Sequence, residues 1–331
     1  MAPGNPANFM MHDVPVDGYA GTDMDILIYV IPGNPGLISL YEPFAMALSG
    51  LIQKSPSLSG VSARICGESL IGFGTGAKDQ ATDLQQTILA VEADLLSFAE
   101  SRHPTRVVLV GHSVGSYILM EILRRHTEGF SPGIDIVGGI MLFPTLTHIG
   151  KSPAGWVLSP FLQLTFFASF ISTLAYLLFF LVPLRLLYLL ALYMGRLPPP
   201  AAETVACFLK SKRDIRQTLW LARDEMMTIQ DDKWGKGVWG CGLPGDPSLY
   251  MYFGKKDPWV RNSDREKLVD DHGQDPELHG KMRAFIDEKE TPHGWCIWHS
   301  DSVAAKTVSW IEEIVHRVAA ERRQFLYGHH L

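Results

Sequence analysis

The sequence around Ser113 has the residue types and spacing of an activated serine nucleophile. The five residues in question are Gly111, His112, Ser113, Val114 and Gly115. They lie between the apolar run Val107–Val110 and a helical pattern, and this order predicts a turn so tight that a side chain at either glycine would clash. Such a turn exposes the serine hydroxyl at the carboxyl edge of a sheet, beside a helix N-terminus that favours negative charge. The alternative is an ordinary strand-to-helix turn that contains a serine by chance.

A serine hydroxyl becomes a good nucleophile when a histidine removes its proton and a carboxylate orients that histidine. In an architecture with this turn, the acid follows the next-to-last strand and the histidine follows the last one. Asp257 comes just after the strand-like run Ser248–Phe253. His293 comes after the run Met282–Asp287. Both lie where ligands bind in α/β sheets, although Asp257 could instead be a turn residue before Pro258.

Two other histidines compete with His293 for the role of the base. His299 lies six residues further on, where a closing helix is about to begin, and His272 precedes the last strand. His293 is in the loop that the order of the triad requires, so we predict that His293 is the base.

A serine that attacks a carbonyl group also needs backbone N–H groups that face the oxyanion as it develops. The N–H of Val114, directly after the nucleophile, is one predicted donor. The loop Gly33–Gly36 after an early strand should supply the other, and Pro35 has no N–H, so we predict Asn34, with its side-chain amide as a further candidate. A Pro-Gly turn with no catalytic part is the alternative.

Short apolar runs, separated by helical patterns, predict the elements that position these residues. The strand-like runs are Ile26–Ile31, Val61–Cys66, Val107–Val110, Ile136–Phe143, Ser248–Phe253 and Met282–Asp287. A helix should begin at Thr82, with Gln85 completing a capping box, and another should cover Asp301–Arg323. The alternation predicts an α/β fold, with a mostly parallel central sheet and helices on both faces.

The alternation stops between residues 150 and 247. We therefore predict a core made of 1–149 and 248–331, and a helical lid or cap insertion at 150–247. The insertion contains a polar helical segment, Ala202–Gln230, and the apolar stretch Phe161–Pro183, which has 23 residues without a charge.

One helix through Phe161–Pro183 would be long enough to cross a bilayer. A single crossing would place the nucleophile on one side of the membrane and its acid and base on the other, which would divide the sheet. A second crossing is interrupted by Pro183 and Arg185. Two possibilities stay open: a hairpin in one leaflet, or a soluble lid packed on the site. Because such a lid would expose an unusually large apolar area, we expect 156–196 to be embedded in a membrane or droplet surface.

Composition narrows the function further. The chain has 331 residues, of which 47% are hydrophobic and 19% are charged, as in folded globular proteins. A net charge of -6 excludes a basic surface for nucleic acid. The cysteines form no CxxC pair and no zinc spacing, so we predict no metal and no cofactor, and reduced thiols on the cytosolic side. They are Cys66, Cys207, Cys241 and Cys296.

Together these motifs resemble the lipid droplet-associated hydrolases, a branch of the α/β-hydrolase superfamily. The resemblance rests on IPGNPG with the following Tyr41–Phe44, on GHSVG, on YFGKKDPW and on TPHGW. It covers the predicted core on both sides of the insertion.

The resemblance implies an α/β-hydrolase fold and a serine hydrolase that cleaves lipid carboxylic esters through an acyl-enzyme on Ser113, with His293 and Asp257. Sterol esters or related neutral lipids are the implied substrates. The implied location is the lipid droplet monolayer and the cytosolic face of the endoplasmic reticulum membrane. A second hypothesis stays open, a droplet surface protein with this fold that acts by binding or remodelling with little turnover.

Overall fold

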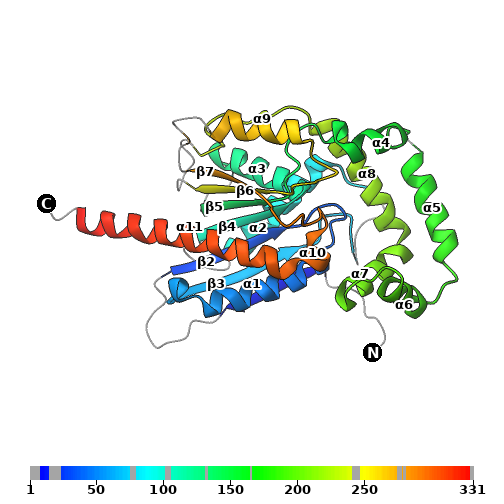
Figure 1. The fold of residues 1–331 in the computed structure, drawn as a ribbon, viewed down its shortest axis with the longest axis horizontal. Coiled ribbons are helices and arrows are strands. Elements are labelled where there is room, and N and C mark those ends of the chain that lie inside the picture. Colours follow the sequence, from blue (N-terminus) through cyan, green and yellow to red (C-terminus); the bar gives the residue numbers. More distant parts are fainter. Residues whose placement is uncertain are drawn as a thin grey trace.

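A computed structural model describes residues 8–14, 24–74, 80–100, 106–130, 133–164, 166–240, 247–273, 278 and 281–328, so Cys241 lies outside the described residues. Within this part, seven strands form one sheet in the order β1-β3-β2-β4-β5-β6-β7 (Figure 1). The strands are β1 (Phe9–Val14), β2 (Met24–Ile31), β3 (Val61–Glu68), β4 (Arg106–His112), β5 (Asp135–Leu142), β6 (Ser248–Phe253) and β7 (Met282–Ile286). β1 is antiparallel to β3 and every other pair is parallel, as predicted for most of the sheet.

Helices cover both faces of the sheet (Figure 1). They are α1 (Glu42–Lys54), α2 (Leu84–Glu100), α3 (Val114–Thr127), α9 (Asn262–Gly273), α10 (Trp295–Trp298) and α11 (Ser300–Gly328), with the 3-10 turns η1 (Ile38–Tyr41) and η2 (Pro56–Leu58). Two adjacent glycines of β5 show the two layers: a Cβ at Gly138 would meet Ile314 of α11, and one at Gly139 would contact Leu119 of α3. Because β5 is covered on both sides, its side chains are apolar almost without interruption.

Two local predictions need correction. β1 was not expected, and its alternation of exposed and buried residues is typical of an edge strand with one wet face. The capping box of α2 lies one residue later than predicted. Asp83 Oδ1 accepts from the Gln86 N–H at 2.7 Å, and Gln86 Oε1 accepts from the Asp83 N–H at 3.1 Å.

Between β5 and β6 the described chain forms a turn and five helices beyond the carboxyl ends of the strands (Figure 1). They are η3 (Ile149–Lys151), α4 (Pro153–Leu162), α5 (Phe167–Phe179), α6 (Leu184–Tyr193), α7 (Pro199–Lys210) and α8 (Lys212–Thr228). We call α4–α8 the lid helices. The polar segment expected as one helix is two, and the Ser211 hydroxyl begins the second by accepting from the Asp214 N–H at 3.1 Å.

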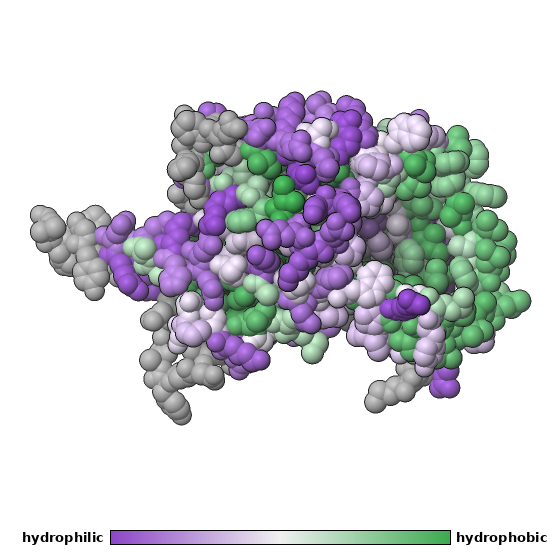
Figure 2. Space-filling view, viewed as in Figure 1, coloured by the Kyte–Doolittle hydropathy of each residue, from purple (hydrophilic) through white to green (hydrophobic). Residues whose placement is uncertain are grey.

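The outer lid helices α4–α6 expose large apolar side chains, and Figure 2 shows a hydrophobic face over this part of the molecule. Trp156 is 77% exposed and Leu181 is 83% exposed. No single described helix has the length and apolar character needed to cross a bilayer, although α4 and α5, bent by 93° relative to each other, reach that length together.

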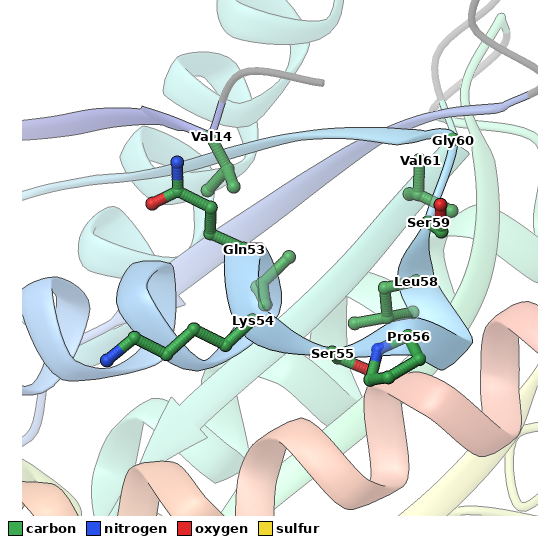
Figure 3. Close-up of a pocket in the computed structure, with 10 residues that line it drawn as sticks. Val14, Gln53, Lys54, Ser55, Pro56, Leu58, Ser59, Gly60 and Val61 are labelled. Atoms are coloured by element: carbon green, nitrogen blue, oxygen red, sulfur yellow. The ribbon is translucent and has the colours of Figure 1, made fainter. Parts of the chain in front are cut away.

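A pocket of about 210 Å³ opens where α1 ends and β3 begins (Figure 3). Its lining includes Lys54, Pro56, Leu58 and Val61. Val61 is the first residue of β3, whereas the predicted nucleophile follows the last residue of the parallel strand β4. The pocket therefore lies at the amino ends of the strands, whereas the predicted site lies at their carboxyl ends.

Candidate active site

Ser113 lies in the tight turn between β4 and α3, with φ 53° and ψ −122°. Positive φ is unfavourable for serine, so the surrounding structure must enforce it. A Cβ at Gly111 would lie 2.5 Å from the Gly115 carbonyl oxygen, and a Cβ at Gly115 would lie 2.3 Å from that of Ile31. Since both neighbours are backbone atoms, the turn can form only with glycine at these two positions.

The structure brings Ser113, His293 and Asp257 together in one series of hydrogen bonds. His293 Nε2 lies 2.9 Å from Ser113 Oγ, and His293 Nδ1 lies 2.8 Å from Asp257 Oδ2. A carboxylate accepts hydrogen bonds, so Nδ1 carries the proton and Nε2 is free to accept the one on the serine hydroxyl. This is the arrangement that a general base needs to activate a serine.

The acid is held by its own loop and by the lid. The Trp259 N–H donates to Asp257 Oδ1 at 2.8 Å, which leaves Oδ2 for His293. The N–H of Ala154 in α4 donates to the Pro258 carbonyl at 2.8 Å. Asp257 is only 8% exposed, so water competes little for its carboxylate.

Three loops around the nucleophile are joined through Tyr41 and His112. The Gly33 N–H donates to the Tyr41 oxygen at 2.8 Å, and this oxygen lies 2.6 Å from Nδ1 of His112. His112 Nε2 is 3.0 Å from the carbonyl of His293, which can only accept, so Nε2 donates and Nδ1 accepts from Tyr41. Burial lowers the pKa of His112 well below its usual value, which keeps the ring neutral.

Both predicted backbone donors belong to segments beside the nucleophile. A Cβ at Gly33 would lie 3.1 Å from the Cβ of Ser113, and Asn34 is the next residue, followed by a cis bond to Pro35. Val114 is the first residue of α3, where a backbone N–H has no acceptor within the helix. Both segments therefore lie beside Ser113, as the prediction requires.

The side-chain amide of Asn34 is engaged by the lid instead. Its Nδ2 donates to the Thr218 carbonyl at 3.0 Å and to Glu225 Oε1 at 2.9 Å, both in α8. An amide nitrogen has two hydrogens, so none is left for an oxyanion, and the amide is not the further donor considered from sequence. Glu225 is 4% exposed. Burial, with a smaller effect of Asp224, raises the pKa of Glu225 to about 8, although the hydrogen bond from Asn34 lowers it.

The two competing histidines lie elsewhere. His299 is exposed between α10 and α11. His272 Nε2 is 2.6 Å from Asp232 Oδ2, and its ring stacks on Trp239 at 4.1 Å. Among the described residues no group of three or more His, Cys, Asp or Glu side chains could hold a metal. Burial raises the pKa of the Cys66 and Cys296 thiols to about 12, which disfavours a cysteine nucleophile at either position.

Tyr41, Thr218 and Glu225 were not found from the sequence. Asn34 and Glu225 are 191 positions apart, so their contact has no local signal. Thr218 and Glu225 are seven residues apart in a helical pattern, which places them on one face but does not show what that face meets. Tyr41 belongs to the motif that follows IPGNPG, and this motif alone predicts no role for it.

The chain is similar to known proteins in both sequence and structure. It is 27% identical over 301 residues to a lipid droplet-associated hydrolase of Rattus norvegicus, covering 86% of this chain and 84% of that protein. A protein of the same name from Drosophila melanogaster is 25% identical over 305 residues, covering 88% of this chain and 90% of the other.

Among solved structures, a thermophilic esterase from Thermogutta terrifontis has a TM-score of 0.54 and 14% identity, covering 92% of this chain and 93% of its own. An esterase from Exiguobacterium antarcticum has a TM-score of 0.53 and 15% identity, with 92% and 95% covered. These similarities confirm the predicted α/β-hydrolase fold. Residues 24–296, which include both halves of the sheet and the lid helices, match the family described as lipid-droplet associated hydrolase. The chain belongs to that family.

Proposed function

We propose that this protein is a serine hydrolase that cleaves carboxylic esters of neutral lipids, sterol esters among them, at the lipid droplet surface and the cytosolic face of the endoplasmic reticulum. The observation that carries the proposal is the series of hydrogen bonds from Ser113 through His293 to Asp257. The names of the relatives, which describe hydrolases associated with lipid droplets, support the class of substrate and the location.

In the proposed reaction, His293 Nε2 takes the proton of Ser113 as Oγ attacks the ester carbonyl carbon. The backbone N–H groups of Asn34 and Val114 stabilise the oxyanion, and Asp257 stabilises the imidazolium. The bond to the alcohol then breaks, and His293 gives its proton to the leaving oxygen, which leaves the acyl group on Ser113. Water, deprotonated by His293, attacks this acyl-enzyme and releases the fatty acid.

We further propose that 150–247 is a lid on a core of 1–149 and 248–331, and that the segment 156–196 sits in the lipid surface. Two observations support this. The exposed apolar side chains of α4–α6 form one face and are not scattered singly over the surface. In addition, α4 contacts the loop that carries Asp257 through Ala154. A water-insoluble ester could then reach Ser113 from the lipid without crossing water.

A serine-directed fluorophosphonate probe tests the enzymatic proposal. We expect the wild type to be labelled and Ser113→Ala to lose labelling, because the probe reacts with a serine activated by its histidine. Ser309→Ala, in α11, is the matched control and should be labelled like the wild type. A panel of lipid esters assayed with the same variants then defines the substrate.

The same experiment separates the two classes of function. A folded wild type that neither reacts with the probe nor releases fatty acid from any ester would reject the hydrolase. It would favour a droplet surface protein that acts by binding or remodelling.

A further inference from the structure

The lid helix α8 lies between the outer lid helices and the catalytic core (Figure 1). It packs against α5 on one side. On the other, the Gln217 amide group exchanges hydrogen bonds of 2.9 Å with the backbone of Thr82, and Asp224 Oδ2 accepts from the Leu84 N–H at 2.7 Å. The position of α8 is thereby fixed relative to the start of α2.

A third attachment of α8 reaches the loop Gly33–Gly36, which we call the predicted oxyanion loop. Thr218 and Glu225 are seven residues apart, two turns of helix, and both accept from Nδ2 of Asn34. The preceding residue is fixed by a different element, because the Gly33 N–H donates to Tyr41 in η1. The peptide between Gly33 and Asn34, which carries the predicted oxyanion donor, is therefore held at both ends.

Glu225 would be an unfavourable residue here if packing alone mattered. A buried carboxyl group costs free energy that leucine or methionine would not. A leucine, however, would leave one hydrogen of the Asn34 amide without an acceptor, and the Thr218 carbonyl alone would then hold this side chain. The carboxyl group is thus best explained by the hydrogen bond that it accepts.

We infer that Glu225 is a positioning residue, which acts through the side-chain amide of Asn34 to hold the Asn34 backbone N–H beside Ser113 and so couples the oxyanion loop to the lid. The inference rests on the proposed hydrolase function. It predicts that the lid affects the rate of the chemical step, in addition to any effect on how lipid enters.

The test uses the full chain with Glu225→Ala, Glu225→Gln, Asn34→Ala and the double alanine variant. The substrate is the soluble ester p-nitrophenyl butyrate, and rates are normalised to the amount of Ser113 that a fluorophosphonate finally labels, so that unfolded protein does not count. We expect Glu225→Ala to lower kcat roughly 10- to 100-fold with KM nearly unchanged, because a displaced donor weakens transition-state binding.

Glu225→Gln should keep most of the activity, since its amide oxygen can accept from Asn34 in the same way. Asn34→Ala should resemble Glu225→Ala, and the double variant should be no slower than either single variant, since both remove one interaction. Gln217→Ala is the matched control. Gln217 is buried on the same helix and also binds the core, but its partner Thr82 is not in the oxyanion loop.

The results decide whether Glu225 positions the oxyanion loop or only attaches α8 to the core. If Glu225→Ala keeps the wild-type kcat, or if Gln217→Ala lowers kcat as much, the positioning role is wrong. In the second case Glu225 would merely help to attach α8. Failure of the wild type itself to react would instead remove the proposed function, and the inference with it.

Discussion

His112 joins the loops of the candidate active site through both of its ring nitrogens, and it is not one of the three residues of the proposed triad. Next to Ser113 in the chain, it donates to the His293 backbone and accepts from Tyr41, which in turn binds Gly33. The proposed nucleophile, the proposed base and the predicted oxyanion loop therefore share one network of hydrogen bonds. A fully satisfied network of this kind favours a single arrangement of its members.

The residues of the proposed triad could be predicted from the sequence, whereas the residues that hold them in position could not. Ser113, Asp257 and His293 follow strands, and the carboxyl ends of parallel strands meet at one edge of the sheet. These positions therefore come together even where the conformations of the loops cannot be predicted. Tyr41 and His112 are 71 positions apart, and Glu225 lies in a helix whose partner surface depends on how the lid docks. Their contacts depend on tertiary packing that no local pattern encodes.

Glu225 gives the protein a stability that depends on pH. Burial raises its folded-state pKa to about 8, from 4.5 for an ordinary glutamate, so the folded protein holds a proton that the unfolded chain releases. The contribution is complete below pH 4.5 and is lost as pH rises through about 8.

Glu225→Gln should remove this dependence, because glutamine does not titrate. We expect its unfolding free energy, relative to wild type, to increase between pH 5 and 9, on the order of a few kcal/mol. Urea unfolding of both proteins at several pH values measures the difference. A difference that is constant over this range would contradict the burial of Glu225 as a neutral acid.

At the scale of elements, covered strands were easier to predict than lid helices. β4 and β5 are apolar along their length because both faces are covered, while β1 at the edge shows only a short alternation. The lid segment has apolar residues all round, so periodicity could not divide it into helices. Proline marks two of the boundaries, since α6 begins after Pro183 and α7 after Pro198.

Alanine should have opposite effects on stability at two glycines, Gly115 in the tight turn after β4 and Gly50 in α1. Gly115→Ala should lower the unfolding free energy by more than about 2 kcal/mol, since its Cβ would lie 2.3 Å from the backbone oxygen of Ile31. Gly50→Ala should raise it by about 1 kcal/mol, because Gly50 is inside α1 with nothing within 4 Å of its Cβ position. Thermal and urea unfolding measure both effects. An unfolding free energy of Gly115→Ala equal to that of the wild type would disprove the close contact of α3 with β2.

Charge, like hydropathy, is distributed unevenly over the whole molecule. Residues 151–223 contain eight Lys and Arg and two Asp and Glu, a formal charge of +6. The complete chain carries -6, so the remainder carries −12. The apolar face of α4–α6 thus belongs to the positive part of the protein, and an anionic lipid surface would attract this part and repel the rest.

Arg185 lies in the first turn of α6 and Arg196 lies three residues after its end, and both side chains are exposed. If the lid rests on lipid with its apolar face down, these side chains reach the headgroups. We expect Arg185→Gln/Arg196→Gln to bind vesicles that contain phosphatidylserine at least about tenfold more weakly, with little change on pure phosphatidylcholine. Lys267→Gln/Lys306→Gln, which removes the same charge from α9 and α11, is the matched control and should not weaken binding.

Leu178→Ser/Leu181→Ser should weaken binding to both kinds of vesicle, because it removes apolar area that enters the lipid whatever the headgroup. Vesicle flotation at two salt concentrations measures all three pairs, and Ser113 labelling reports that each variant is folded. Higher salt should weaken the arginine-dependent part of binding and leave the leucine-dependent part. Equal losses for the two arginines and the two control lysines would mean that net charge, and not the orientation of the lid, governs the attraction.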